Sequence, residues 1–272
     1  MNATFALGDL PPTCHWQHAP GNGLPDRVRV ALFGSFHGGR TVLQTLLGTL
    51  ADRVQVVGVA TDDPSRPYTN ARVRLWKYPH TPEEEQLVTR LAEEHGLPVF
   101  TGRVRTEAFA ATFAREWRPE LCLMATFGQR IPARLYEFPS LGFYNFHHSD
   151  TAWPSYPGPD PIRDLVRDGK RQVVITLHEV VEALDEGRLV AQSSPVALPP
   201  QPNAVTVHRL TWPRMPDFID GVVRRLLREG AGHSGPRRPE TDFLPGPWIC
   251  PSEWVRPGSR RPTSWVLLPT DN

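Results

Sequence analysis

The chain has 272 residues, a length that suits one α/β domain with extensions or at most two small domains. Its formal net charge is +1, so the charge balance does not call for nucleic acid or an anionic membrane as a partner. No apolar run approaches the about 20 residues that span a bilayer, and the first residues lack the pattern of a secretory signal. The three cysteines, Cys14, Cys122 and Cys250, form no CxxC pair, which favours a reducing, cytoplasmic location and no metal site.

Thirty prolines are unevenly spread and divide the chain into three parts. They crowd the first 26 residues and the segment after Pro236, where tryptophans also gather without periodicity. We therefore expect a proline-rich N-terminal extension over 1–26, one folded domain over 27–230, and a short irregular C-terminal strap over 231–272.

The domain alternates strand-like and helix-like runs. In chain order, the pattern predicts strand 28–33, helix 41–50, strand 54–60, a helix from the capping box Thr81-Pro-Glu-Glu84 to about His95, strand 97–100, helix 107–117, strands 121–127, 143–147, 173–177 and 189–196, and a helix over 203–228 interrupted near Pro213 and Pro216. This alternation indicates an α/β fold with a doubly wound, mostly parallel sheet.

Polar residues follow two of these strands, where ligands of doubly wound sheets bind. Asn145 and His147 lie two positions apart, so they face one pocket together, and Asp185 follows a later strand in a turn. An amide, an imidazole and a carboxylate that converge would suit acyl transfer, because the first two can donate to a developing oxyanion. On spacing alone, a histidine near a strand end is more often a structural group, so both interpretations stay open.

Four short motifs carry a resemblance to a known family. In order, they are Phe127-Gly-Gln-Arg-Ile-Pro132, Leu141-Gly-Phe-Tyr-Asn-Phe-His147, Tyr156-Pro-Gly158 and Leu184-Asp-Glu-Gly187. Over roughly residues 27 to 200, the chain resembles the folate-dependent formyltransferases, which act on methionyl-tRNA, glycinamide ribonucleotide, amino sugars or hydroxyornithine. The resemblance implies a Rossmann-like formyltransferase fold and a catalytic domain over 27–230.

The resemblance also implies the chemistry of the site. Asn145, His147 and Asp185 match the family's catalytic residues, and the donor is 10-formyltetrahydrofolate, with no metal. An amine attacks the formyl carbon, Asn145 and protonated His147 steady the oxyanion, and Asp185 supports His147 and raises its pKa. The expected donor-binding residues are Met124, Phe127, Gly128, Ile131, Val181 and Leu184.

Three features depart from the family pattern or leave alternatives open. His148 stands where a proline is usual, and the segment Ser149 to Pro154 is two residues longer than its counterpart, so we expect His148 to be a loop histidine. Asp150 and Asp160 could meet a cationic acceptor, although solvated loop carboxylates are the favoured interpretation. The turn Gly34 to Arg40 lacks a phosphate-loop fingerprint, and its glycines serve either phosphate binding or the turn itself.

The favoured function is formyl transfer to the amine or hydroxylamine of a small metabolite, with no nucleic acid or membrane as partner. Hydroxyornithine, in siderophore biosynthesis, is preferred because a hydroxylamine is neutral near pH 7 and Asp150 could pair with its α-ammonium. An amino-sugar nucleotide and methionyl-tRNA are the alternative acceptors. The tRNA enzyme is expected to need a further C-terminal barrel and a more basic surface. The non-enzymatic alternatives are a silent folate-binding scaffold and an NAD-binding protein, and the latter lacks its glycine fingerprint.

Overall fold

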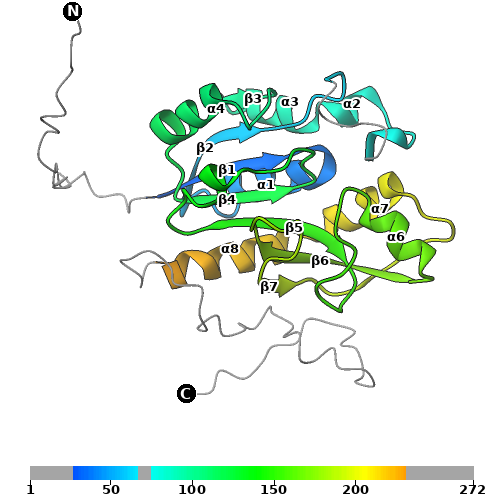
Figure 1. Cartoon of the computed structure of the whole chain (residues 1–272). Coiled ribbons are helices and arrows are strands. Elements are labelled where there is room, and N and C mark those ends of the chain that lie inside the picture. Colours follow the sequence, from blue (N-terminus) through cyan, green and yellow to red (C-terminus); the bar gives the residue numbers. More distant parts are fainter. Residues whose placement is uncertain (1–26, 67–74, 231–272) are drawn as a thin grey trace, which may run out of the picture.

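The computed structural model describes residues 27–66 and 75–230, so the extensions expected over 1–26 and 231–272 lie outside the described residues. The domain is built on one sheet with the strand order β3-β2-β1-β4-β5-β6-β7, and β8 pairs with β6 (Figure 1). The strands are β1 Val28–Gly34, β2 Val54–Ala60, β3 Val99–Phe100, β4 Leu121–Ala125, β5 Phe143–Ser149, β6 Gln172–Glu179, β7 Leu189–Gln192 and β8 Val196–Ala197. The expected α/β architecture is confirmed.

The sheet is parallel from β3 to β5 and antiparallel beyond. β6 runs opposite to β5, which places Asn145 directly beside His178. The strand expected over 189–196 is two strands, because the chain leaves β6 after Gln192 and pairs with it again at Val196.

Helices cover both faces of the sheet, as a doubly wound fold requires (Figure 1). The helices are α1 Phe36–Leu47, α2 Pro82–Glu85, α3 Leu87–Glu94, α4 Glu107–Thr112, α5 Ala133–Tyr136, α6 Pro161–Arg167, α7 Ala204–Thr211 and α8 Pro216–Gly230, with a π-helical turn over Phe113–Trp117. Along β1, Val30 and Leu32 pack with α1, α3 and α8, whereas Ala31 and Phe33 pack with α4 on the opposite face. No helix within the described ranges is long and apolar enough to cross a bilayer.

Helix α1 begins at Phe36, five residues before the expected start at position 41, so Gly38 and Gly39 belong to its first turn. A Cβ atom on Gly38 would lie 2.3 Å from the Thr126 hydroxyl oxygen, and one on Gly39 would lie 2.5 Å from the carbonyl carbon of Gly34. Close packing between α1 and the ends of β1 and β4 therefore explains both glycines.

The other helices follow their local signals in most places. The capping box at Thr81 is confirmed, but the helix it opens breaks at Gln86 into α2 and α3. The proline interruption of the later helix is also confirmed, since α7 and α8 are joined by a 3₁₀ turn over Trp212–Arg214. Helix α6 was not expected, although its signal is local: Asp160 caps it by accepting from the Arg163 N–H, and a proline follows at the first helical position.

Candidate active site

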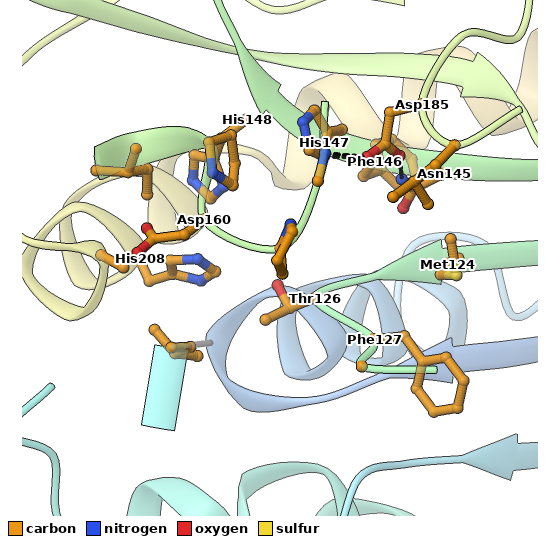
Figure 2. A pocket seen from close by; sticks show the side chains of 18 of the residues that line it. Met124, Thr126, Phe127, Asn145, Phe146, His147, His148, Asp160, Asp185 and His208 are labelled. Atoms are coloured by element: carbon orange, nitrogen blue, oxygen red, sulfur yellow. Dashed lines mark hydrogen bonds and ion pairs between the residues drawn. The ribbon is translucent and has the colours of Figure 1, made fainter. Parts of the chain in front are cut away.

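A cavity of about 330 Å³ opens at the carboxyl ends of β4 and β5. These neighbouring parallel strands place Met124 beside Asn145, so the loop after β4 and the end of β5 share one edge of the sheet. Ligands of doubly wound folds bind at this edge. Residues from distant parts of the chain line the cavity, among them Met124, Phe127, Asn145, His147, Asp185 and His208 (Figure 2).

The three predicted catalytic residues come together on one wall of this cavity. The Asn145 amide nitrogen donates to Asp185 Oδ1 at 3.2 Å, and His147 Nδ1 lies 3.8 Å from Asp185 Oδ2. The Gly158 N–H donates to the same Oδ2 at 2.9 Å. All three side chains are at least nine-tenths buried. The distance from His147 is too long for a direct hydrogen bond, as is common in a site without substrate.

The hydrogen bonds of His147 determine where its ring carries a proton. Nε2 lies 2.9 Å from the Tyr156 carbonyl oxygen, which can only accept, so Nε2 carries a hydrogen and Nδ1 faces Asp185. Burial lowers the pKa of His147, and this outweighs the opposing effect of Asp185. Asp185 raises the pKa of His147, as expected, but desolvation of the ring lowers it by more, so the pKa lies below the usual value of a histidine.

The Asp185 carboxylate is the charged group of the site. Burial raises the pKa of this carboxyl, whereas His147 and the Gly158 N–H stabilise its charged form and bring the pKa down to about 2. Asp185 itself has a positive φ of 55°, a conformation that costs energy for a residue other than glycine and that is common at functional turns. The site at neutral pH thus combines an anionic Asp185 with a neutral His147.

His178 is a fourth member of this group that the sequence did not single out. Its Nε2 lies 3.2 Å from the Asn145 amide nitrogen and 3.6 Å from Asp185 Oδ1. Nδ1 donates to the Glu179 carbonyl oxygen at 2.8 Å, so Nε2 is the ring nitrogen that can accept from Asn145. This arrangement turns the Asn145 amide nitrogen toward Asp185 and His178. A histidine at the end of an apolar strand was the signal available, but only the antiparallel register of β5 and β6 brings it to the site.

The structure places the expected donor-binding residues around the same cavity. Met124, Phe127, Gly128 and Leu184 line the main cavity, and Ile131 and Val181 line a small adjoining one of about 30 Å³ together with Met124 and Leu184. Leu184 is 52% exposed and Val181 40%, so the loop before Asp185 offers apolar surface for a flat ligand. The Gly128 N–H donates to Asp62 Oδ2 at 2.7 Å, which anchors the loop after β4.

The structure places His148, Asp150 and Asp160 differently from what the sequence led us to expect. His148 is the sixth residue of β5 and is buried, so it is not a loop histidine. Asp150 is buried against Lys170, with which it forms an ion pair, and it therefore neither is solvated nor faces an acceptor. Asp160 is also buried: it caps α6 and binds Lys77 and the Tyr78 hydroxyl, each at 2.8 Å. Ion pairing, which spacing does not reveal, removed both carboxylates from the surface.

The Asp62 carboxylate lies beside Ser35, the residue that precedes α1. The Ser35 hydroxyl donates to Asp62 Oδ2 at 3.0 Å and accepts from the Asp62 N–H at 2.9 Å. A phosphate at this helix end would meet the Asp62 carboxylate, so we assign Gly38 and Gly39 to packing. Within residues 27–66 and 75–230, no group of three or more His, Cys, Asp or Glu side chains is arranged to hold a metal ion.

Comparison with known proteins agrees with this geometry. The chain is 28% identical over 165 residues to the methionyl-tRNA formyltransferase of Thermotoga maritima, a match that covers 61% of this chain and 48% of that protein. It is 32% identical over 188 residues to the methionyl-tRNA formyltransferase of Bacillus licheniformis, covering 65% of this chain and 55% of that protein. The chain thus spans about half the length of the curated relatives it matches.

Solved structures share the fold. Glycinamide ribonucleotide transformylase 1 from Symbiobacterium toebii superposes with a TM-score of 0.57 at 17% identity, covering 75% of this chain and 89% of that chain. A sugar 3N-formyl transferase in the presence of dTDP and 5-N-formyl-THF gives a TM-score of 0.52 at 14% identity, covering 76% and 65%. A family model described as formyl transferase matches residues 27–211, which include β1 to α7 and the cavity wall, and this chain belongs to that family.

Proposed function

We propose that this protein transfers a formyl group from 10-formyltetrahydrofolate to the amine of a small molecule. The observation that carries the proposal is the convergence of Asn145, His147 and Asp185 on one wall of a cavity, in a member of the formyl transferase family. Formyl transfer needs hydrogen-bond donors for an oxyanion and a group that relays a proton, and these three side chains supply both.

The donor end of the cavity fits a folate. The apolar side chains of Met124, Phe127 and Leu184 offer a surface for the pterin ring, and Ile131 and Val181 extend it into the adjoining small cavity. The Gly128 backbone lies on the same wall. One structural relative is described in the presence of 5-N-formyl-THF, which supports a reduced folate as the donor.

The reaction balances with these residues alone. The neutral amine nitrogen forms a bond to the formyl carbon, and the former carbonyl oxygen becomes an oxyanion beside Asn145 and His147. The amine then loses a proton through Asp185, and the folate nitrogen N10 takes up a proton as its bond to the carbon breaks. Asp185 favours the protonated form of His147. The negative charge that develops on the substrate favours it further, and the two effects together offset the effect of burial on the ring.

The acceptor must present an unprotonated nitrogen. A simple alkyl ammonium with a pKa near 10 is about 99.9% protonated at pH 7, whereas a hydroxylamine is largely neutral and the less basic amine of an amino sugar is neutral in part. Hydroxyornithine stays within this class, although its proposed ion pair with Asp150 is not available, because Lys170 occupies that carboxylate. Methionyl-tRNA is a second candidate, since the relatives from Thermotoga maritima and Bacillus licheniformis carry the name of a formyltransferase that acts on it.

The proposal is tested by following tetrahydrofolate release from 10-formyltetrahydrofolate with a panel of acceptors at one pH. The panel contains hydroxyornithine, ornithine, an amino sugar, an amino-sugar nucleotide and methionyl-tRNA. We expect release that depends on a weakly basic small amine. Donor binding, followed by quenching of tryptophan fluorescence with NADH as the control ligand, is expected for the folate only. Tight binding of the folate with no transfer to any acceptor would instead identify a silent scaffold.

A further inference from the structure

Two histidines lie against each other on the part of the cavity wall away from Asp185. His148 lies near the end of β5 and His208 comes from α7 (Figure 2), and their ring centroids are 4.5 Å apart. Both residues line the cavity, and both are more than nine-tenths buried. Neither takes part in the chemistry derived above, and their side chains are in contact with the space left for the acceptor.

The hydrogen bonds around His148 determine its tautomer. The Thr211 hydroxyl donates its single hydrogen to the Val207 carbonyl oxygen at 2.9 Å. Its oxygen lies 3.0 Å from His148 Nε2 and can only accept there, so Nε2 carries the ring hydrogen. Nδ1 of His148 is then a lone-pair acceptor, and it makes no hydrogen bond to any described residue.

His208 is held in the opposite sense by the indole of Trp212. The Trp212 Nε1–H can only donate, and it donates to His208 Nδ1 at 3.0 Å, so the neutral His208 ring carries its hydrogen on Nε2. Trp212 also packs edge-on against His148, at 5.5 Å between ring centroids. One buried tryptophan therefore supports both rings, and His148 gives the cavity wall an acceptor.

This wall favours a neutral donor on the ligand. Burial, reinforced by neighbouring His147, lowers the pKa of His148 to about 3, so its Nδ1 lone pair persists at neutral pH. A carboxylate or phosphate cannot donate to this lone pair, and a buried cation would lose its hydration. The carboxylate nearest to this wall, Asp160, is already paired with Lys77. A hydroxyl group satisfies the lone pair at the lowest desolvation cost.

We propose that His148 is a specificity-determining residue that accepts a hydrogen bond from a hydroxyl group of the acceptor, on the same small molecule that carries the reacting amine. This inference rests on the proposed formyl transfer. The hydroxyl belongs either to an amino sugar or to an N-hydroxy amine, and these share the chemistry that His148 recognises.

The test compares acceptors that differ only in the hydroxyl group. One pair is glucosamine and 3-deoxyglucosamine, and the other is Nδ-hydroxyornithine and its O-methyl ether, which keeps the low basicity but cannot donate. For each pair, kcat/KM is measured in the wild-type protein and in three variants. His148→Phe removes the lone pair and keeps a ring, His148→Asn restores an acceptor oxygen, and Thr211→Val removes the bond to Nε2 but keeps the imidazole.

In the wild-type protein, we expect one pair to show a preference of about tenfold for the hydroxyl form, as for one neutral hydrogen bond. His148→Phe should reduce this preference to near unity with an unchanged KM for 10-formyltetrahydrofolate, and His148→Asn should recover part of it. Thr211→Val should lower the preference less than His148→Phe does, because the imidazole remains but the oxygen that holds its hydrogen on Nε2 is lost. The pair that responds identifies the source of the hydroxyl.

A preference that survives in His148→Phe would overturn the inference while formyl transfer stands. Transfer that is confined to acceptors outside both pairs, or to methionyl-tRNA, would overturn it as well. Absence of tetrahydrofolate release with every acceptor in the larger panel would instead contradict the proposed function itself. Thermal unfolding of each variant shows whether it is folded, and the preference ratio compares two acceptors on the same protein, so it does not depend on the folded fraction.

Discussion

Each buried histidine of the site has a neighbouring group that can only donate, or can only accept, the hydrogen bond between them. Backbone carbonyls hold His147 and His178, a hydroxyl that already donates holds His148, and an indole N–H holds His208. The four rings are thus arranged before any ligand binds, with known acceptor and donor atoms. Side chains that need no reorganisation during the reaction are the ones that stabilise developing charge most effectively.

The first prediction concerns the catalytic residues. His147→Ala and Asp185→Asn should each lower kcat by roughly 10²–10⁴, since each removes an oxyanion donor or the group that supports it. Donor affinity should change little, because the apolar residues and backbone at the other end of the cavity hold the folate. Glu186→Gln is the matched control, as it neutralises the exposed carboxylate next in sequence. Wild-type kcat in either variant would refute the assignment.

A second prediction concerns the pH dependence of stability. His148 has a pKa of about 3 in the folded protein against 6.5 for an ordinary histidine, so only the unfolded chain takes up this proton between those values. Stability should therefore fall as pH drops below 6.5, by up to about 1.4 kcal/mol per pH unit from this group. Urea unfolding of His148→Phe between pH 7 and 4 should give a shallower slope, whereas the exposed His95→Asn should match the wild type.

At the scale of elements, a charged cluster ties three helices together beside the cavity. Glu84, the third residue of α2, accepts from Nε and Nη2 of Arg209, each at 2.7 Å, and lies 2.9 Å from His37 Nε2. The same carboxylate completes the capping box by accepting from the Thr81 N–H at 2.8 Å. One side chain thereby links α1, α2 and α7, the helix that carries His208.

The third prediction follows from this link. Hydrogen bonds from Arg209 lower the pKa of Glu84 from 4.5 to about 2, against the opposing effect of burial. A lowered folded-state pKa stabilises the protein above pH 4.5, and the contribution is lost as pH falls toward 2. Glu84→Gln should cost on the order of 2–3 kcal/mol of unfolding free energy at pH 7 and much less near pH 3. Glu83→Gln, one residue earlier and exposed, should cost little at either pH.

At the scale of the whole molecule, the parallel and antiparallel halves of the sheet meet at the site. β4 and β5 are the last parallel pair, and β6 is the first antiparallel strand. The loop after β4 supplies the wall that we propose for the donor, β5 supplies Asn145 and His147, and β6 supplies His178. The strands and the three apolar core clusters that the structure describes lie between residues 27 and 230, so this range holds the described core and the site together.

The fourth prediction is that residues 27–230 fold as one unit. Expressed alone, this fragment should unfold in a single cooperative transition, with the same midpoint by far-UV circular dichroism and tryptophan fluorescence. It should also retain the affinity for 10-formyltetrahydrofolate, since the described donor wall lies within it. The full chain serves as the reference. Two separate transitions, or a fragment that fails to bind the folate, would count against this division of the chain.

The sequence by itself determined the features that depend on neighbours along the chain. Apolar runs predicted the strands, the capping box at Thr81 predicted a helix start, and the two-residue step from Asn145 to His147 predicted a shared pocket. The turn after a later strand pointed to Asp185, the resemblance supported it, and the structure brings it to the other two. These signals survive folding because hydrogen bonding and side-chain direction repeat over short distances.

Only the tertiary structure decided the features that depend on partners far away in the sequence. His178 reaches Asn145 through strand register, and Asp150 is removed from the acceptor side by Lys170. His148 becomes a buried acceptor because Thr211 approaches it from α7. A polar side chain has the same local pattern whether it is solvated, ion-paired or aimed into a cavity. Which of these it becomes is decided by burial and by the partner that the fold supplies.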